Sequence, residues 1–161
     1  MKQRLNYAEV DPKLLRAMFA LGAPVAQSGL ETSLIELIDF RVSQINGCAY
    51  CLDMHSKDLR AAGETEQRLY MLEAWREAPF YSERERAALA WAEAVTLLTN
   101  KEVPDEVYEQ ARAQFSEQEL AVLTLAVVAI NGWNRLNIAF RTPAGDYQPG
   151  MFKAATTALA S

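Results

Sequence analysis

Cys48 and Cys51 stand three residues apart and are the only cysteines of the chain. His55, the only histidine, follows Cys51 by four residues. Because residues three or four apart share one helix face, a helix that begins near Cys48 brings both sulfurs and the imidazole together. The partial positive charge of a helix N-terminus stabilises a thiolate, and an adjacent imidazole can accept the thiol proton. These residues therefore have the parts of a reactive thiol site.

Such a pair can be oxidised by a peroxide and closed into a disulfide. A thiolate that attacks a peroxide becomes a sulfenic acid, and a nearby second thiol condenses with it. A reduced partner must then reopen the disulfide by exchange. We expect Cys51 to be the peroxidatic thiol, because His55 lies one turn away, and Cys48 to be the resolving thiol. The reverse order stays open, since the first cysteine of thioredoxin-like sites is the more exposed nucleophile.

Glu36 and Tyr50 are the supporting candidates. Glu36 lies opposite an apolar stripe on the expected helix, so its face is either solvated or covered by another element. Tyr50 either donates a hydrogen bond into the site or packs against it. Two other interpretations of the cysteine pair remain open. The cysteines are inert core residues, or they bind zinc together with His55 and Glu36, although structural zinc usually takes four Cys or His ligands.

The elements that must position these residues are predicted to be helices throughout. Asp11 before a proline, and capping boxes that begin at Ser82 and Ser116, mark helix starts. Asn46 before a glycine, and Gly63, mark helix ends. No segment shows the period-2 alternation of a strand, so we expect an all-α, compact multi-helix bundle. The expected helices cover about 11–23, 34–46, 48–62, 66–76, 82–98, 104–115 and 116–140.

Length and composition bound the class of protein. The 161 residues fit one domain, 1–161, with its chemical motif at 36–55 and an irregular tail from about 142. The net charge of −5 and the scattered basic residues make nucleic acid an unexpected partner. No apolar run reaches the ~20 residues that span a bilayer, and no secretory signal is apparent. A close cysteine pair suits a cytoplasmic redox protein better than a secreted disulfide scaffold.

Residues 120–130 are apolar on every side of the expected helix. A helix without a polar face must be covered all round. In a chain of this length we expect burial between subunits and therefore a homo-oligomer. The alternative is the central helix of a monomeric bundle.

Glu36, Cys48, Cys51 and His55 stand as E-x11-C-x2-C-x3-H. This spacing resembles the core motif of the AhpD-like alkylhydroperoxidases, within the carboxymuconolactone decarboxylase superfamily. The flanking text RVSQINGCAYCLDMHSKDLRAAGE and the later VVAINGWNRLNIAF look similar to the same family. The resemblance extends over most of residues 30–141.

The resemblance implies an all-α fold, trimers or hexamers, and a cysteine-based peroxidase without haem, metal or flavin. Glu36 and His55 would form a proton relay to the cysteine pair. The best-known member carries a histidine between its cysteines, where this chain has Tyr50, which at an ordinary pKa near ~10 is a poor base. The decarboxylase branch generally lacks the cysteine pair.

The sequence thus predicts a thiol-dependent peroxidase that reduces hydrogen peroxide or organic hydroperoxides. It would need no bound cofactor, only an external dithiol or redox-protein reductant. A thiol–disulfide oxidoreductase or adaptor with little peroxide chemistry is the first alternative. A non-redox, decarboxylase-like member of the superfamily is the second.

Overall fold

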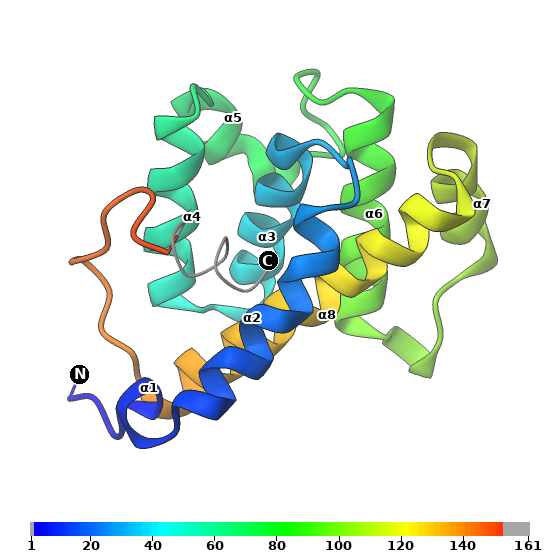
Figure 1. Cartoon of the computed structure of the whole chain (residues 1–161). Helices are drawn as coiled ribbons and strands as arrows, with labels where there is room; N and C mark the ends of the chain where they lie inside the picture. The colour runs from blue at the N-terminus through cyan, green and yellow to red at the C-terminus, as the bar shows by residue number, and fades with distance from the viewer. Residues whose placement is uncertain (1, 153–161) are drawn as a thin grey trace.

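The computed structural model describes residues 2–152, and every regular element within that range is a helix, which confirms the predicted all-α class (Figure 1). The elements are α1 (Tyr7–Val10), α2 (Pro12–Ala26), α3 (Thr32–Asn46), α4 (Ala49–Ala61), α5 (Glu66–Met71), η1 (Leu72–Ala74), α6 (Glu83–Leu97), η2 (Thr99–Lys101), α7 (Asp105–Gln114) and α8 (Glu117–Phe140).

The expected start and stop signals act where the sequence places them. The Asp11 side chain accepts the backbone N–H of Lys13 and caps α2. Reciprocal capping boxes form at Ser82 for α6 and at Ser116 for α8. Gly47 ends α3 at a positive φ of 69°, a conformation that glycine adopts without steric cost. Local signals therefore set most helix boundaries.

Three boundaries differ from the expected ones. The one-turn helix α1 was not predicted, and α2 continues through Pro24 to Ala26. The helix expected over 66–76 shortens to α5 and the 3₁₀ turn η1. Beyond that turn the Arg86 guanidinium of α6 donates to the carbonyls of Trp75 and Ala78. Because Arg86 satisfies these carbonyls, the chain can leave the helical conformation after η1 without unpaired backbone groups.

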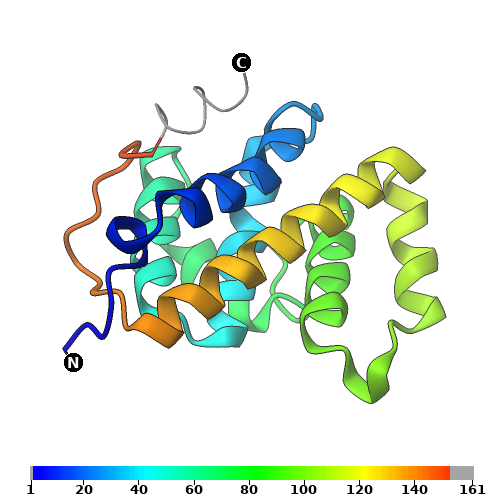
Figure 2. The same ribbon diagram turned by 60° about the horizontal axis from the view of Figure 1, so that its bottom comes forward.

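The long helix α8 lies at the centre of the bundle and contacts α2, α3 and α6 (Figure 2). Leu123 and Val127 are fully buried within the single chain, whereas Val128 is half exposed. A Cβ on Gly132 would lie 2.9 Å from the Met18 side chain, so α2 approaches α8 closely there. This arrangement matches the alternative of a central bundle helix, and the homo-oligomer stays a prediction.

The segment that follows α8 is irregular from Thr142 to Phe152 and returns along α4 (Figure 1). The Lys57 ammonium of α4 donates to the carbonyls of Gly145 and Tyr147. These bonds hold the tail against the helix that carries the cysteines. The rest of the expected tail, residues 153–161, lies outside the described residues.

Within the described residues, one bent pair of helices resembles a membrane span in length and apolar composition. No single helix there is long and apolar enough to cross a bilayer, and only α7 and α8 taken together, across a bend of 118°, reach that length and composition.

Candidate active site

Cys48 and Cys51 form a disulfide at the N-terminus of α4. The turn at Gly47 ends α3 and places Cys48 as the N-cap of α4, where its sulfur accepts the Cys51 N–H at 3.4 Å. Both side chains are buried, with 1% of each exposed. The helix start expected from the sequence thus brings the two sulfurs into bonding distance at the positive end of a helix.

His55 and Glu36 meet across the α3–α4 contact. The imidazole Nδ1 lies 2.9 Å from Glu36 Oε2, and the histidine is buried. Burial alone would lower the pKa of His55, but the hydrogen bond to Glu36 and the negative charge of Asp39 raise it above the ordinary 6.5. With Nδ1–H donated to a carboxylate, Nε2 of the neutral ring is free to accept a proton. That Nε2 atom is buried without a hydrogen-bond partner.

A cavity of about 890 Å³ borders this pair. Cys51, His55 and Glu36 line the cavity, whereas Cys48 is not among the described residues of its wall. α1, α2, α3, α4, α8 and the C-terminal tail all contribute residues to that wall. The structure therefore places Cys51 and His55, whose Nε2 is unpartnered, at a common cavity.

Asp39 is a site residue that the sequence interpretation missed. Its Oδ1 atom is buried without a hydrogen-bond partner, and the residue lines the cavity. Burial raises the pKa of Asp39 from 3.8 to about 7, helped by the charge of Glu36 and opposed by that of His55. Its place three residues after Glu36, on the same helix face, was the available signal.

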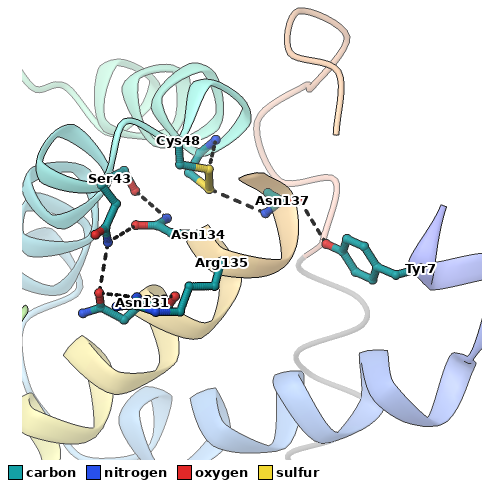
Figure 3. The surroundings of a disulfide bond; sticks show 9 residues. Tyr7, Ser43, Cys48, Asn131, Asn134, Arg135 and Asn137 are labelled. Atoms are coloured by element: carbon teal, nitrogen blue, oxygen red, sulfur yellow. Dashed lines mark hydrogen bonds between the residues drawn. A yellow bond between two sulfur atoms is a disulfide. The ribbon is translucent and has the colours of Figure 1, made fainter. Parts of the chain in front are cut away.

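Asn137 of α8 contacts the disulfide, and Tyr7 of α1 contacts Asn137 (Figure 3). The Asn137 amide donates to the Cys51 sulfur at 3.5 Å. The Tyr7 hydroxyl donates to the Asn137 amide oxygen at 3.0 Å, and burial raises the pKa of Tyr7 to about 12. A neutral tyrosine thus orients an amide whose N–H groups point toward the sulfur. No local pattern in the sequence links α1 to this site.

Tyr50, the other supporting candidate, lines the cavity in a half-buried position. Burial raises the pKa of its hydroxyl, which keeps it protonated at neutral pH. The described contacts include no hydrogen bond of this hydroxyl to the disulfide or to His55. A second tyrosine, Tyr147 of the tail, donates to Asp58 Oδ2 at 2.7 Å on the cavity wall.

The zinc interpretation predicted a cluster of metal ligands. Within residues 2–152 no group of three or more His, Cys, Asp or Glu side chains is arranged to hold a metal ion. The four motif residues are instead engaged in pairs, as a disulfide and as a hydrogen-bonded imidazole and carboxylate.

The family is decided by a match over more than half of the chain. The model of the carboxymuconolactone decarboxylase family matches residues 12–94, which include the entire E-x11-C-x2-C-x3-H motif. The chain belongs to this family. The all-helical fold and the relatives below place it among the AhpD-like members.

Two relatives show how far the sequence similarity reaches. The uncharacterised protein YdfG of Bacillus subtilis (strain 168) is 46% identical over 139 residues, covering 86% of this chain and 95% of YdfG. AhpD, an alkyl hydroperoxide reductase of Mycobacteroides abscessus, is 44% identical over 45 residues, covering 28% of this chain and 26% of AhpD.

A crystal structure also resembles the whole fold. ATU0492 of Agrobacterium tumefaciens is a protein of unknown function assigned to AhpD-type antioxidant defence. It superposes with a TM-score of 0.86 at 44% identity, covering 91% of this chain and all of that one. The AhpD-like member described here therefore shares its architecture with a solved protein along nearly its whole length.

Proposed function

We propose that this protein is a thiol-dependent peroxidase in which Cys51 attacks the peroxide and Cys48 resolves the product. One observation carries the proposal: Cys51 lies on the wall of a cavity beside a buried His55 whose Nδ1 is bound to Glu36 and whose Nε2 is unpartnered. An imidazole held in this way is a general base aimed by a carboxylate. Family membership supports the redox class.

The first half of the cycle reduces the peroxide. His55 Nε2 accepts the Cys51 thiol proton, and Glu36 stabilises the resulting imidazolium. The thiolate sulfur attacks the terminal peroxide oxygen, so an S–O bond forms and the O–O bond breaks. The proton held by His55 passes to the leaving oxygen, which departs as an alcohol or as water. Cys51 is thereby oxidised to a sulfenic acid.

The second half restores the thiols. The Cys48 thiol attacks the Cys51 sulfur, the S–S bond forms, and hydroxide leaves with the Cys48 proton as water. The 5.3 Å between the two Cα atoms permits this bond without rearrangement of α4. An external dithiol, not a resident cofactor, supplies the two electrons that reopen the disulfide by exchange.

The assignment of roles rests on access. Cys51 borders the cavity and accepts the Asn137 amide N–H, a donor that stabilises a thiolate. Cys48 is not among the described residues of the cavity wall, and a buried disulfide is poorly placed to meet a folded protein partner directly, which favours a peroxidase over an adaptor. A cytoplasmic location fits a cycle that depends on reduced dithiols, and a trimer or hexamer fits the family.

The test is to trap the sulfenic acid in single-cysteine variants. Reduced Cys48→Ser protein treated with cumene hydroperoxide is expected to form a dimedone adduct at Cys51, located by peptide mass spectrometry. Reduced Cys51→Ser protein is expected to form none at Cys48. Adducts at Cys48 alone would reverse the roles, and the absence of adducts in both variants would overturn the peroxidase proposal.

A further inference from the structure

The charges on the cavity wall are all of one sign apart from the imidazole. Three carboxyl groups line the cavity, from Glu36, Asp39 and Asp58, and a pKa of about 7 leaves that of Asp39 partly ionised at neutral pH. No lysine or arginine occurs among the described residues of this wall. Lys57, which is next to Asp58 in the sequence, is bound to Asp53 and to two tail carbonyls. A ligand in the cavity therefore meets a negative field that no basic side chain of the wall offsets.

Most of the remaining wall is apolar. The cavity of about 890 Å³ lies within the range of pockets that hold organic molecules, and it is far larger than hydrogen peroxide requires. Phe19 and Trp133 pack edge to face there, with ring centroids 5.2 Å apart. The aromatic and aliphatic side chains that surround the space include Phe19, Leu30, Ile35, Met54, Ile130 and Trp133.

Three buried polar atoms on the same wall lack hydrogen-bond partners. They are His55 Nε2, Asp39 Oδ1 and Thr142 Oγ1, and all three residues line the cavity. Buried polar atoms are normally paired, so unpaired ones that share a cavity indicate a bound polar group. A hydroperoxide group has one O–H donor and two acceptor oxygens. It can therefore form hydrogen bonds with the imidazole of His55, the carboxyl group of Asp39 and the hydroxyl of Thr142. One small polar head on an apolar body fits this wall.

We infer that the cavity selects an uncharged organic hydroperoxide with an apolar body and rejects one that carries a carboxylate. The inference rests on the proposed function for the reaction itself. It adds that Asp39 and Asp58 act as specificity residues, because each places a carboxyl group on the wall of the cavity that an anionic substrate would occupy. Removal of an anionic substrate from water into this wall is costly without a cationic partner.

The experiment compares two substrates that differ in charge. Cumene hydroperoxide with a para-carboxylate and its methyl ester are each mixed with reduced protein at low ionic strength, and the rate of thiol loss is followed. The ester is expected to react about tenfold faster or more, the size of effect that like charges at close range produce. Equal rates, or a faster carboxylate, would overturn the inference while leaving the peroxidase intact.

A charge variant identifies the residues responsible. In Asp58→Asn the amide oxygen can still accept the Tyr147 hydroxyl, so the wall keeps its shape and loses one charge. The ester-to-acid rate ratio is expected to fall about threefold or more. Glu109→Gln removes a charge from an exposed site on α7 outside the wall and is expected to leave the ratio unchanged. Asp39→Asn provides a second test if Asp58→Asn does not fold.

Binding separates the two proposals if neither hydroperoxide reacts. That result would overturn the peroxidase function and leave the charge preference to be measured with the unreactive product alcohols. Calorimetry on the oxidised protein is expected to show tighter binding of the alcohol ester than of its carboxylate. Equal binding of both alcohols would overturn the inference by itself.

Discussion

Two carboxyl groups with buried oxygen atoms, those of Glu93 and Asp39, have opposite environments in the fold. Glu93 of α6 accepts from Arg41 at 2.8 Å and from Trp75 at 2.9 Å, and pairs with Arg76 at 2.6 Å. Burial opposes ionisation of Glu93, but these hydrogen bonds hold its pKa below the ordinary 4.5. Asp39 has an unpartnered oxygen, and burial raises its pKa to about 7.

The two environments indicate different roles: Glu93 stabilises the bundle, whereas Asp39 belongs to the candidate active site. The Glu93 cluster has its acceptors filled, and it joins α3, α6 and the turn after η1. The cavity that Asp39 lines keeps polar atoms unfilled beside a reactive pair. Proteins violate the rules of polar satisfaction mainly where a ligand completes them. We therefore expect changes at Glu93 to alter stability, and changes around the cavity to alter chemistry.

The largest effect is expected at the reactive sulfur. Cys51→Ser removes the nucleophile that borders the cavity, so peroxide turnover with a dithiol should fall by at least about a thousandfold. The urea midpoint of the reduced variant should be close to that of the reduced wild-type protein, since the substitution changes the side-chain volume little. Residual turnover within tenfold of the wild type would contradict the assignment of Cys51.

Glu93→Ala is the matched change on the structural side. It leaves the largely buried Arg41 side chain without its carboxylate, 12% of it being exposed, and frees the Trp75 N–H, so the free energy of unfolding should fall by about 3 kcal/mol. The rate of thiol oxidation in the folded protein should stay within about twofold of the wild type. Urea denaturation and stopped-flow oxidation measure the two quantities. A large loss of the oxidation rate without a loss of stability would contradict the structural role of Glu93.

The two carboxylates should also give stability opposite dependences on pH. Folding raises the pKa of Asp39 from 3.8 to about 7, so its contribution is greatest below about pH 4 and is lost as the pH rises to about 7. Folding lowers the pKa of Glu93, so its contribution is present above 4.5 and is lost as the pH falls through the folded pKa.

Denaturation of two isosteric variants across pH tests these slopes. Asp39→Asn should remove a loss of stability, on the order of a few kcal/mol, between about pH 4 and about 7. Glu93→Gln should flatten the fall of stability below pH 4.5 instead. If both variants change the same limb of the curve, the two carboxylates do not differ as described.

The smallest effects are expected in the amide and tyrosine behind the sulfur. Asn137→Ala removes a hydrogen bond to the Cys51 sulfur, so thiolate formation and peroxide reaction should slow about tenfold. Tyr7→Phe removes only the group that orients the amide and should slow the reaction about threefold. The pH profile of alkylation at Cys51 measures the thiol pKa, which should rise in Asn137→Ala. An unchanged profile would leave Asn137 with a packing role.

Signals between residues close in sequence predicted most of the helices. In the site, they predicted Cys48, Cys51, His55 and Glu36. The capping boxes at Ser82 and Ser116 and the turn at Gly47 act through neighbours in sequence, so they can be recognised without a structure. The pairing of Glu36 with His55 depends on α3 and α4 being adjacent, which a short turn between them ensures.

Long-range contacts account for what was missed. Tyr7 and Asn137 are 130 positions apart, and Tyr147 and Asp58 are 89 apart, so no periodicity relates the members of either pair. The shortened α5 depends on Arg86, a side chain from the next long helix. Asp39 had a local signal, its spacing from Glu36, but its lack of a partner follows only from the packing around it.

The most direct test of the central claim is stopped-flow oxidation of the reduced protein by cumene hydroperoxide, with the free thiols counted afterwards. The account predicts rapid loss of both thiols of each chain and their recovery with an added dithiol. Thiols that survive the peroxide yet exchange readily with a small disulfide would contradict it and would identify a thiol–disulfide oxidoreductase instead.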